Sequence, residues 1–137
     1  MHALNFLNKK ILIKNVVGLQ PTSPIRDSYD FDRAITKFNN LNYDSLFSGN
    51  YIYDYNSWKV KADKLIPNYN FKKRSRRQDI KNLILENGSF YLFNPHKFLK
   101  NKNRLFGKIG FYIMSKRKGF QIDDYLDIKI IESIFHN

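Results

Sequence analysis

The stretch from residue 11 to residue 26 constrains the fold more than any other part of the chain. Residues 11–19 are mostly aliphatic and rich in β-branched side chains, which is typical of a strand covered on both faces of a parallel sheet. Pro21 and Pro24 end this strand, because proline lacks a backbone donor and restricts the residue before it. We therefore predict a buried strand that delivers Gln20 to the sheet edge where open α/β folds bind ligands.

Length and composition predict one globular domain. The chain has 137 residues, of which 42% are hydrophobic, and it contains no cysteine. This is enough for a hydrophobic core, and it excludes disulfides and thiolate metal sites. No apolar run approaches the ~20 residues of a membrane span, and the amino terminus is too short and polar for a signal peptide. We expect a soluble, cytoplasmic protein without a membrane partner.

The charge of the chain is strongly basic, with a formal net value of +12. Such a surface keeps a protein soluble, and it also suits an anionic partner. That partner could be a nucleic acid, a nucleotide or an acidic sugar. Charge alone does not distinguish them.

The first half of the chain predicts a strand, helix and strand in succession. Residues 2–9 have a partial apolar face, as in the last turns of a helix. Asp27 or Ser28 can cap a helix that ends at Asn39-Asn40. Its apolar stripe consists of Phe31, Ala34, Ile35 and Phe38. With a short strand at 44–48, this order is a parallel crossover unit.

Residues 51–81 have a different character, because aromatic and basic side chains alternate there without a helical period. The aromatic members are Tyr51, Tyr53, Tyr55, Trp58 and Tyr69. The mixture suits a platform for single-stranded nucleic acid or an arm that contacts another subunit. We favour an extended arm.

The remaining chain is predicted to form short elements joined by turns. Asn87-Gly88 is a turn signal. Strands are expected at 89–93, 110–114 and 120–122, and helices at 94–99 and after Asp123 or Asp124. The terminal helix is expected to point four apolar residues inward, namely Leu126, Ile130, Ile131 and Ile134.

Five segments carry a family resemblance. They are LQPTSPIR at 19–26, RRQD at 76–79, ENGSFYL at 86–92, YIM at 112–114 and IDDYLD at 122–127. In this order they resemble motifs of the acylneuraminate cytidylyltransferases, the CMP-sialic acid synthetases, and the resemblance runs from about residue 3 to residue 134. It implies an α/β fold of the partial three-layer, Rossmann-like nucleotidyltransferase type. That fold has a mixed sheet and an arm, here at 51–81, through which two subunits form a homodimer.

The resemblance also implies an activity and a set of site residues. Such enzymes join CMP from CTP to a nine-carbon acidic sugar (sialic, legionaminic or pseudaminic acid) and release pyrophosphate with Mg²⁺. It places Arg77 at the sugar carboxylate and Asp123 at the metal. The other positions matching its sugar site are Gln20, Lys59, Asn87, Tyr91, Leu105 and Phe106, of which Leu105 and Phe106 match a pair that covers the N-acyl group.

The residue types are compatible with these roles, but each has a simpler alternative. The guanidinium of Arg77 can hold a carboxylate with two hydrogen bonds, or Arg77 can belong to a basic surface run. Asn87 can simply form a turn, and Tyr91 and Phe106 can simply pack in the core. Asp123 can supply a hard oxygen for Mg²⁺, or it can cap the last helix.

The chain also departs from the family pattern. Gln121 stands at the position of a metal-binding aspartate, so a full negative charge is missing there, and Leu85 stands where the family often has arginine. No segment resembles the glycine-rich loop that holds the phosphates of CTP. The sequence thus resembles a truncated enzyme that carries the sugar side, and we expect it to be inactive alone.

Two other functions stay open at this stage. The chain could be a non-catalytic remnant that binds the sugar or forms dimers. It could also be a basic nucleic-acid-binding domain, although the acidic residues Asp123, Asp124 and Asp127 near the expected site argue against this.

Overall fold

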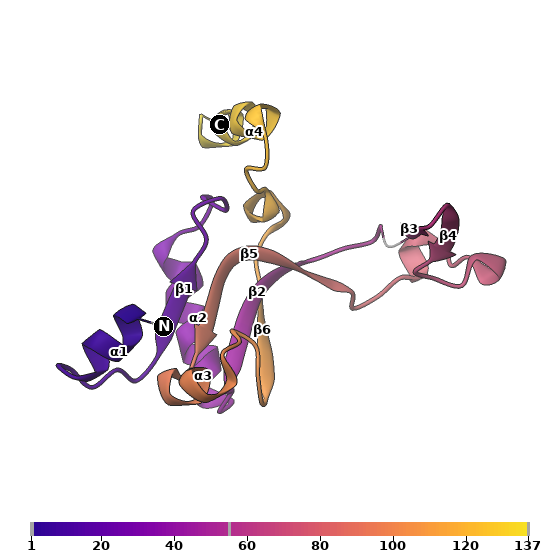
Figure 1. The fold of residues 1–137 in the computed structure, drawn as a ribbon. Coiled ribbons are helices and arrows are strands. Elements are labelled where there is room, and N and C mark those ends of the chain that lie inside the picture. The colour runs from indigo at the N-terminus through magenta and orange to yellow at the C-terminus, as the bar shows by residue number, and fades with distance from the viewer. Residues whose placement is uncertain (1, 55, 137) are drawn as a thin grey trace. The chain divides into compact units, whose positions relative to one another are not determined.

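The computed structural model describes residues 2–54 and 56–136 (Figure 1). The chain forms two compact units, which we call the sheet unit (Met1–Asn50 and Glu86–Asn137) and the arm (Tyr51–Leu85). The excursion predicted at 51–81 falls within the arm. Tyr55, one of its aromatic residues, lies outside the described residues. No helix in the described ranges is long and apolar enough to cross a membrane.

A four-stranded mixed sheet has the order β1-β5-β2-β6 (Figure 1). The strands are β1 (Val16–Leu19), β5 (Ile84–Phe93), β2 (Ser45–Tyr51) and β6 (Ile109–Ile113). β1 is antiparallel to β5, and β2 is parallel to β6. β5 also runs opposite to β2, because Asn50 contacts Asn87 at one end while the Asn94 N–H donates to the Asp44 carbonyl at the other. The carboxyl ends of β1, β2 and β6 therefore share one edge of the sheet.

The strand at the start of the chain differs from the prediction. Residues 11–15 are not part of a strand, and β1 lies at the edge of the sheet rather than inside it. Leu19 is 50% exposed and Leu12 is 82% exposed. The prediction of a strand buried on both faces is wrong because β-branched composition also suits an edge strand.

The strand that is buried on both faces is β5. Phe90 and Leu92 join one hydrophobic cluster, which includes Ala34 and Phe38 of helix α2 (Ser28–Asn40). Tyr91 joins a second cluster with residues from beyond β5. Because successive side chains of a strand point to opposite faces, the two clusters lie on opposite sides of the sheet.

Asn87-Gly88 lies inside β5 and is not the predicted turn. Gly88 has a φ of +65°, a left-handed conformation that glycine adopts without a steric penalty. Asn-Gly pairs favour this conformation both in hairpin turns and in strand irregularities. The Asn87-Gly88 pair therefore indicates a left-handed backbone at this position, but the chain continues as a strand before and after it.

The helices mostly begin where their caps predict. The described residues contain α1 (His2–Asn8), α2, α3 (Pro95–Asn101), α4 (Tyr125–Phe135) and the 3-10 turns η1 (Phe71–Lys73), η2 (Arg77–Asp79) and η3 (Lys116–Gly119). Asp27 caps α2 in a reciprocal capping box with Asp30. Asn94 caps α3, with Pro95 in its first turn. These two helix starts confirm the sequence-based expectation.

The end of the chain needs two corrections. Residues 120–122 form no strand; instead the Ile122 N–H donates to the Thr22 carbonyl at 2.8 Å. Asp124, one of the two predicted caps, caps α4. Ile131 is buried, but Leu126 is 63% exposed. A separation of five residues rotates a side chain by roughly 140° around a helix, so both cannot face the same neighbour.

The arm contains a two-stranded hairpin formed by β3 (Trp58–Lys61) and β4 (Lys64–Pro67). Ala62 and Asp63 connect the strands, and both have positive φ angles, as a type I′ turn requires. The Trp58 ring lies 5.9 Å from the Tyr69 ring and 5.7 Å from the Phe71 ring. Aromatic contacts thus support a hairpin that would be marginal alone.

Candidate functional site

Three side-chain oxygens gather at the sheet edge where β1 ends. A Cβ atom placed on Gly88 would lie 2.2 Å from Gln20 Oε1, 3.3 Å from Ser23 Oγ and 3.3 Å from Gln121 Oε1. We call Gln20, Ser23, Gly88 and Gln121 the polar rim. The missing side chain of Gly88 leaves the space that the Gln20 amide occupies. Two of the predicted site positions, Gln20 and Gln121, are therefore brought together.

The loop that carries Gln20 is held by an arginine that sequence reasoning passed over. Nη1 of Arg26 donates to the carbonyl oxygens of Gln20 at 3.1 Å, Ser23 at 2.7 Å and Ser89 at 3.0 Å. Ser23 Oγ donates to the Asn87 carbonyl at 3.1 Å. Arg26 thus fixes the loop against β5. The available signal was the segment LQPTSPIR itself, which ends in this residue.

Asn87 lies in a buried hydrogen-bond network. Its side chain is buried, with 2% of the residue exposed. Oδ1 accepts from Ser48 Oγ at 2.6 Å and from the Ser89 N–H at 3.1 Å. Nδ2 donates to Asn50 Oδ1 at 2.9 Å. All these partners lie inside the fold, so a structural role accounts for Asn87, and its predicted role in sugar binding stays a prediction.

Tyr91, Leu105 and Phe106 belong to the second hydrophobic cluster, with Tyr91 and Phe106 buried and Leu105 half-buried. The Tyr91 hydroxyl donates to Glu86 Oε2 at 2.8 Å, and the Arg104 guanidinium lies 4.3 Å from its ring centre. Burial, followed by the hydrogen bond to Glu86, raises the pKa of the Tyr91 hydroxyl. Packing accounts for all three residues, as the simpler alternative predicted for Tyr91 and Phe106.

Asp123 is exposed and lies two residues beyond Gln121. Its backbone N–H donates to Asp127 Oδ2 at 2.9 Å. The capping box of α4 uses the side chains of Asp124 and Asp127, so the Asp123 carboxylate takes no part in it. Within residues 2–54 and 56–136, no group of three or more histidine, cysteine or acidic side chains is arranged to hold a metal ion. The assignment of Asp123 to Mg²⁺ stays a prediction.

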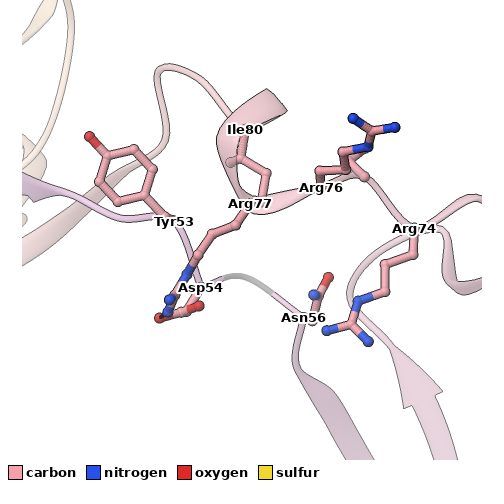
Figure 2. A pocket seen from close by; sticks show the side chains of 8 residues that line it. Tyr53, Asp54, Asn56, Arg74, Arg76, Arg77 and Ile80 are labelled. Atoms are coloured by element: carbon pink, nitrogen blue, oxygen red, sulfur yellow. Dashed lines mark hydrogen bonds and ion pairs between the residues drawn. The ribbon is translucent and has the colours of Figure 1, made fainter.

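The arm has its own polar pocket, with a volume of about 500 Å³. Its lining comprises Tyr53, Asp54, Asn56, Arg74, Ser75, Arg76, Arg77 and Ile80. Figure 2 shows Arg77 extended to Asp54, with which it forms an ion pair. Both side chains are more than half exposed, at 67% and 77%, so this pair contributes at most about 1 kcal/mol. An incoming carboxylate can therefore replace Asp54 at small cost.

Lys59 lies on β3, opposite Ile66, and is exposed. It is not among the residues that line the polar pocket of the arm. Lys59 and Arg77 belong to the arm, whereas the polar rim and Asp123 belong to the sheet unit. The resemblance implies that Arg77, Gln20 and Asp123 converge on one cleft, and this convergence stays a prediction. No protein-family model matches this chain, so the resemblance depends on the five sequence segments.

Proposed function

We propose that these residues form the sugar-binding and dimerising part of an acylneuraminate cytidylyltransferase, built on a Rossmann-like nucleotidyltransferase fold. The polar rim is the observation that supports the proposal. Gln20 comes from the segment at 19–26, Gly88 from the segment at 86–92, and Gln121 directly precedes the segment at 122–127. Residues in or next to three family-like segments, which are far apart in the sequence, thus lie close together in the structure.

The reaction proposed is the transfer of CMP from CTP to a nine-carbon acidic sugar. The anomeric hydroxyl forms a bond to the α-phosphorus, the bond from that phosphorus to the bridging oxygen breaks, and pyrophosphate leaves as the hydroxyl proton is lost. The Gln20 amide can donate to and accept from sugar hydroxyls. Arg77, once released from Asp54, can hold the sugar carboxylate with two parallel hydrogen bonds.

We place the proposed Mg²⁺ site at the same edge of the sheet. Mg²⁺ is commonly bound by one or two carboxylates together with phosphate oxygens. Asp123 supplies an exposed carboxylate, and Gln121 supplies an amide oxygen at the polar rim. When bound, the ion would neutralise charge on the triphosphate. Gln121 in place of aspartate lowers the negative charge of this donor set, so we expect weaker metal binding than with two carboxylates.

The 137 residues contain no glycine-rich loop with the spacing of a phosphate cradle. Stabilisation of phosphate charge supplies most of the catalysis in phosphoryl transfer. A polypeptide of these residues alone should therefore release no pyrophosphate from CTP and sugar. Among the described strands β1 pairs only with β5, so its outer edge could pair with a strand from a cradle-bearing segment.

Sugar binding provides the direct test. Calorimetric titration with N-acetylneuraminate should give measurable affinity for the wild-type chain. Gln20→Ala and Arg77→Ala should each weaken it by roughly tenfold or more, the scale of a lost charged or buried hydrogen bond. Lys100→Ala, an exposed charge on α3, is the matched control and should leave it unchanged. Absence of binding by the wild type would overturn the proposal, and salt-sensitive oligonucleotide binding instead would favour the nucleic-acid reading.

The proposed homodimer uses the hairpin of the arm. Val60 and Leu65 are directly opposite one another, so they share a face, and they are 74% and 65% exposed. Burying such a side chain contributes about 1.5–3 kcal/mol. Val60→Lys should shift the mass measured by light scattering toward the monomer, whereas Lys61→Ser on the opposite face should not. A wild-type chain that is monomeric at every concentration tested would refute this assembly.

A further inference from the structure

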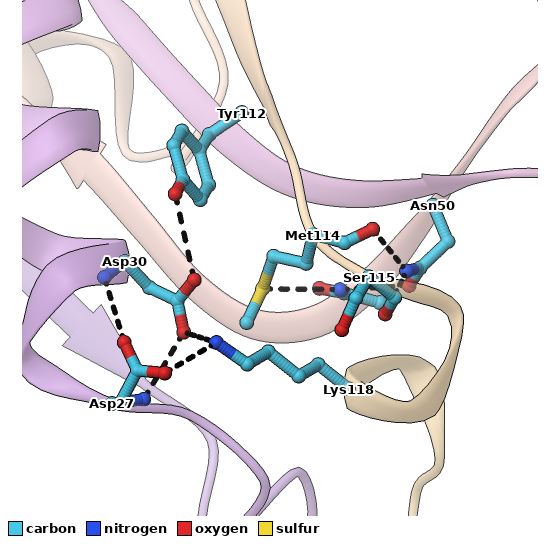
Figure 3. Close-up of polar contacts among 8 residues, drawn as sticks. Asp27, Asp30, Asn50, Tyr112, Met114, Ser115 and Lys118 are labelled. Carbon is cyan, nitrogen blue, oxygen red and sulfur yellow. Dashed lines mark hydrogen bonds and ion pairs between the residues drawn. The ribbon is translucent and has the colours of Figure 1, made fainter.

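Lys118 makes the most enclosed ion pairs among the described residues. Its side chain, from η3, is 15% exposed, and Nζ donates to Asp27 Oδ2 at 2.6 Å and to Asp30 Oδ2 at 2.7 Å. Figure 3 shows the ammonium group reaching both carboxylates. The Tyr112 hydroxyl also donates to Asp30, at 3.4 Å. Asp30 is 7% exposed at the side chain, so Lys118 is the cation that compensates an enclosed carboxylate.

The carboxylates of Asp27 and Asp30 both cap the start of α2. Asp27 and Asp30 form the capping box of α2, in which each side chain accepts from the other residue's backbone N–H. Capping of this kind needs no lysine. Placing two carboxylates together is unfavourable without a counter-ion, and the hydrogen bond from Lys118 holds the pKa of Asp27 below its usual value. Lys118 is therefore an addition to the cap.

The position of Lys118 in the chain indicates what this addition does. Lys118 precedes Gln121 by one short turn, and Asp27 follows Arg26, which fixes the Gln20 loop. The ion pairs thus join the segment bearing Gln121 to the segment bearing Gln20. A backbone bond from the Ile122 N–H to the Thr22 carbonyl, 2.8 Å long, joins the same two segments.

The start of the Gln121 segment is also fixed. Asn50 Nδ2 donates to the carbonyls of Met114 and Ser115, each at 2.8 Å. Beyond Ser115, the Asn50 side chain also packs against Gly119, but the ion pairs of Lys118 are the side-chain hydrogen bonds that tie η3 to another element in the described structure. We propose that Lys118 is a positioning residue of the polar rim, whose bonds to Asp27 and Asp30 hold Gln121 opposite Gln20. For its ligand, this inference rests on the proposed sugar-binding function.

Hydrogen exchange measured by NMR on the full chain tests the placement without a ligand. In Lys118→Met, the Ile122 amide should exchange roughly tenfold faster or more, because a charged hydrogen bond that closes the segment is lost. Amides of β2 and β5 should keep their wild-type rates. Lys118→Arg, which retains the charge, should restore most of the protection. Lys116→Met removes an exposed charge from the same turn and is the matched control.

Titration of the same variants with N-acetylneuraminate tests the consequence. Lys118→Met should weaken binding by about tenfold, within the range of coupling between residues of one network, while Lys118→Arg and Lys116→Met stay close to wild type. An Ile122 exchange rate equal in Lys118→Met and Lys116→Met would overturn the inference, as would faster exchange throughout the sheet. If the wild type binds no sugar, the proposed function fails, while the exchange result still decides the role of Lys118.

Discussion

Replacing Asn87 by alanine tests whether this residue serves the fold rather than a ligand. The substitution removes the acceptor of the Ser89 N–H and the donor to Asn50 Oδ1, both buried. Ser48 keeps a partner, because its hydroxyl also lies 3.0 Å from the Phe90 carbonyl. Two buried polar groups are therefore left unpaired.

The expected cost follows from that count. Each unpaired buried group costs about 1–3 kcal/mol, so Asn87→Ala should lower the free energy of unfolding by roughly 2–6 kcal/mol. Domains of this size have only about 5–15 kcal/mol in total. With a urea dependence of about 1–3 kcal/mol per molar, the midpoint should fall by at least roughly 0.7 M.

Urea unfolding followed by circular dichroism measures this change. Asn15→Ala is the matched control, since the Asn15 side chain donates to Asn39 Oδ1 at the surface. Loss of that bond should cost at most about 0.5 kcal/mol. Equal midpoints for the two variants would refute the assignment of Asn87 to the buried network. Normal stability with lost sugar affinity would instead support the predicted binding role of Asn87.

Two further predictions concern the kink of β5 and alkaline pH. Gly88→Ala should lower the free energy of unfolding by about 1–2 kcal/mol because position 88 has a left-handed backbone. Gly18→Ala is the control: its added Cβ would meet Phe93 at an ordinary 3.6 Å, so it should change the free energy of unfolding by less than about 0.5 kcal/mol. Equal urea midpoints for the two variants would contradict this prediction. Burial raises the pKa of Tyr91 above 10.0. For Lys118, burial acts to lower the pKa, but the hydrogen bonds to Asp27 and Asp30 outweigh it and raise the pKa above 10.5. Since both groups hold their protons more tightly when folded, stability should be complete below about pH 10 and fall as the pH rises further. Tyr91→Phe should reduce that fall in a pH series of urea titrations, and an unchanged slope would argue against it.

The sequence determined the features that depend on neighbours along the chain. The starts of α2 at its Asp27 cap and of α3 at Asn94-Pro95 follow from side chains within one helical turn. β2 and β6 lie within a few residues of the predicted 44–48 and 110–114. Gly88 has a positive φ, as many turn glycines do, but the turn predicted from Asn87-Gly88 was wrong because the pair lies inside β5.

Only the tertiary structure decided the features that depend on distant partners. The edge position of β1 follows from its pairing with β5, and composition is the same for an edge and a central strand. Asn87 became a core residue because Asn50 and Ser48 of β2 meet it. Gln20 and Gln121 meet at Gly88 because three strand ends share one edge. Helix caps and hydrophobic periodicity depend on residues three or four positions apart, whereas strand pairing joins segments that are far apart in the sequence. Local sequence patterns therefore do not predict which strands pair.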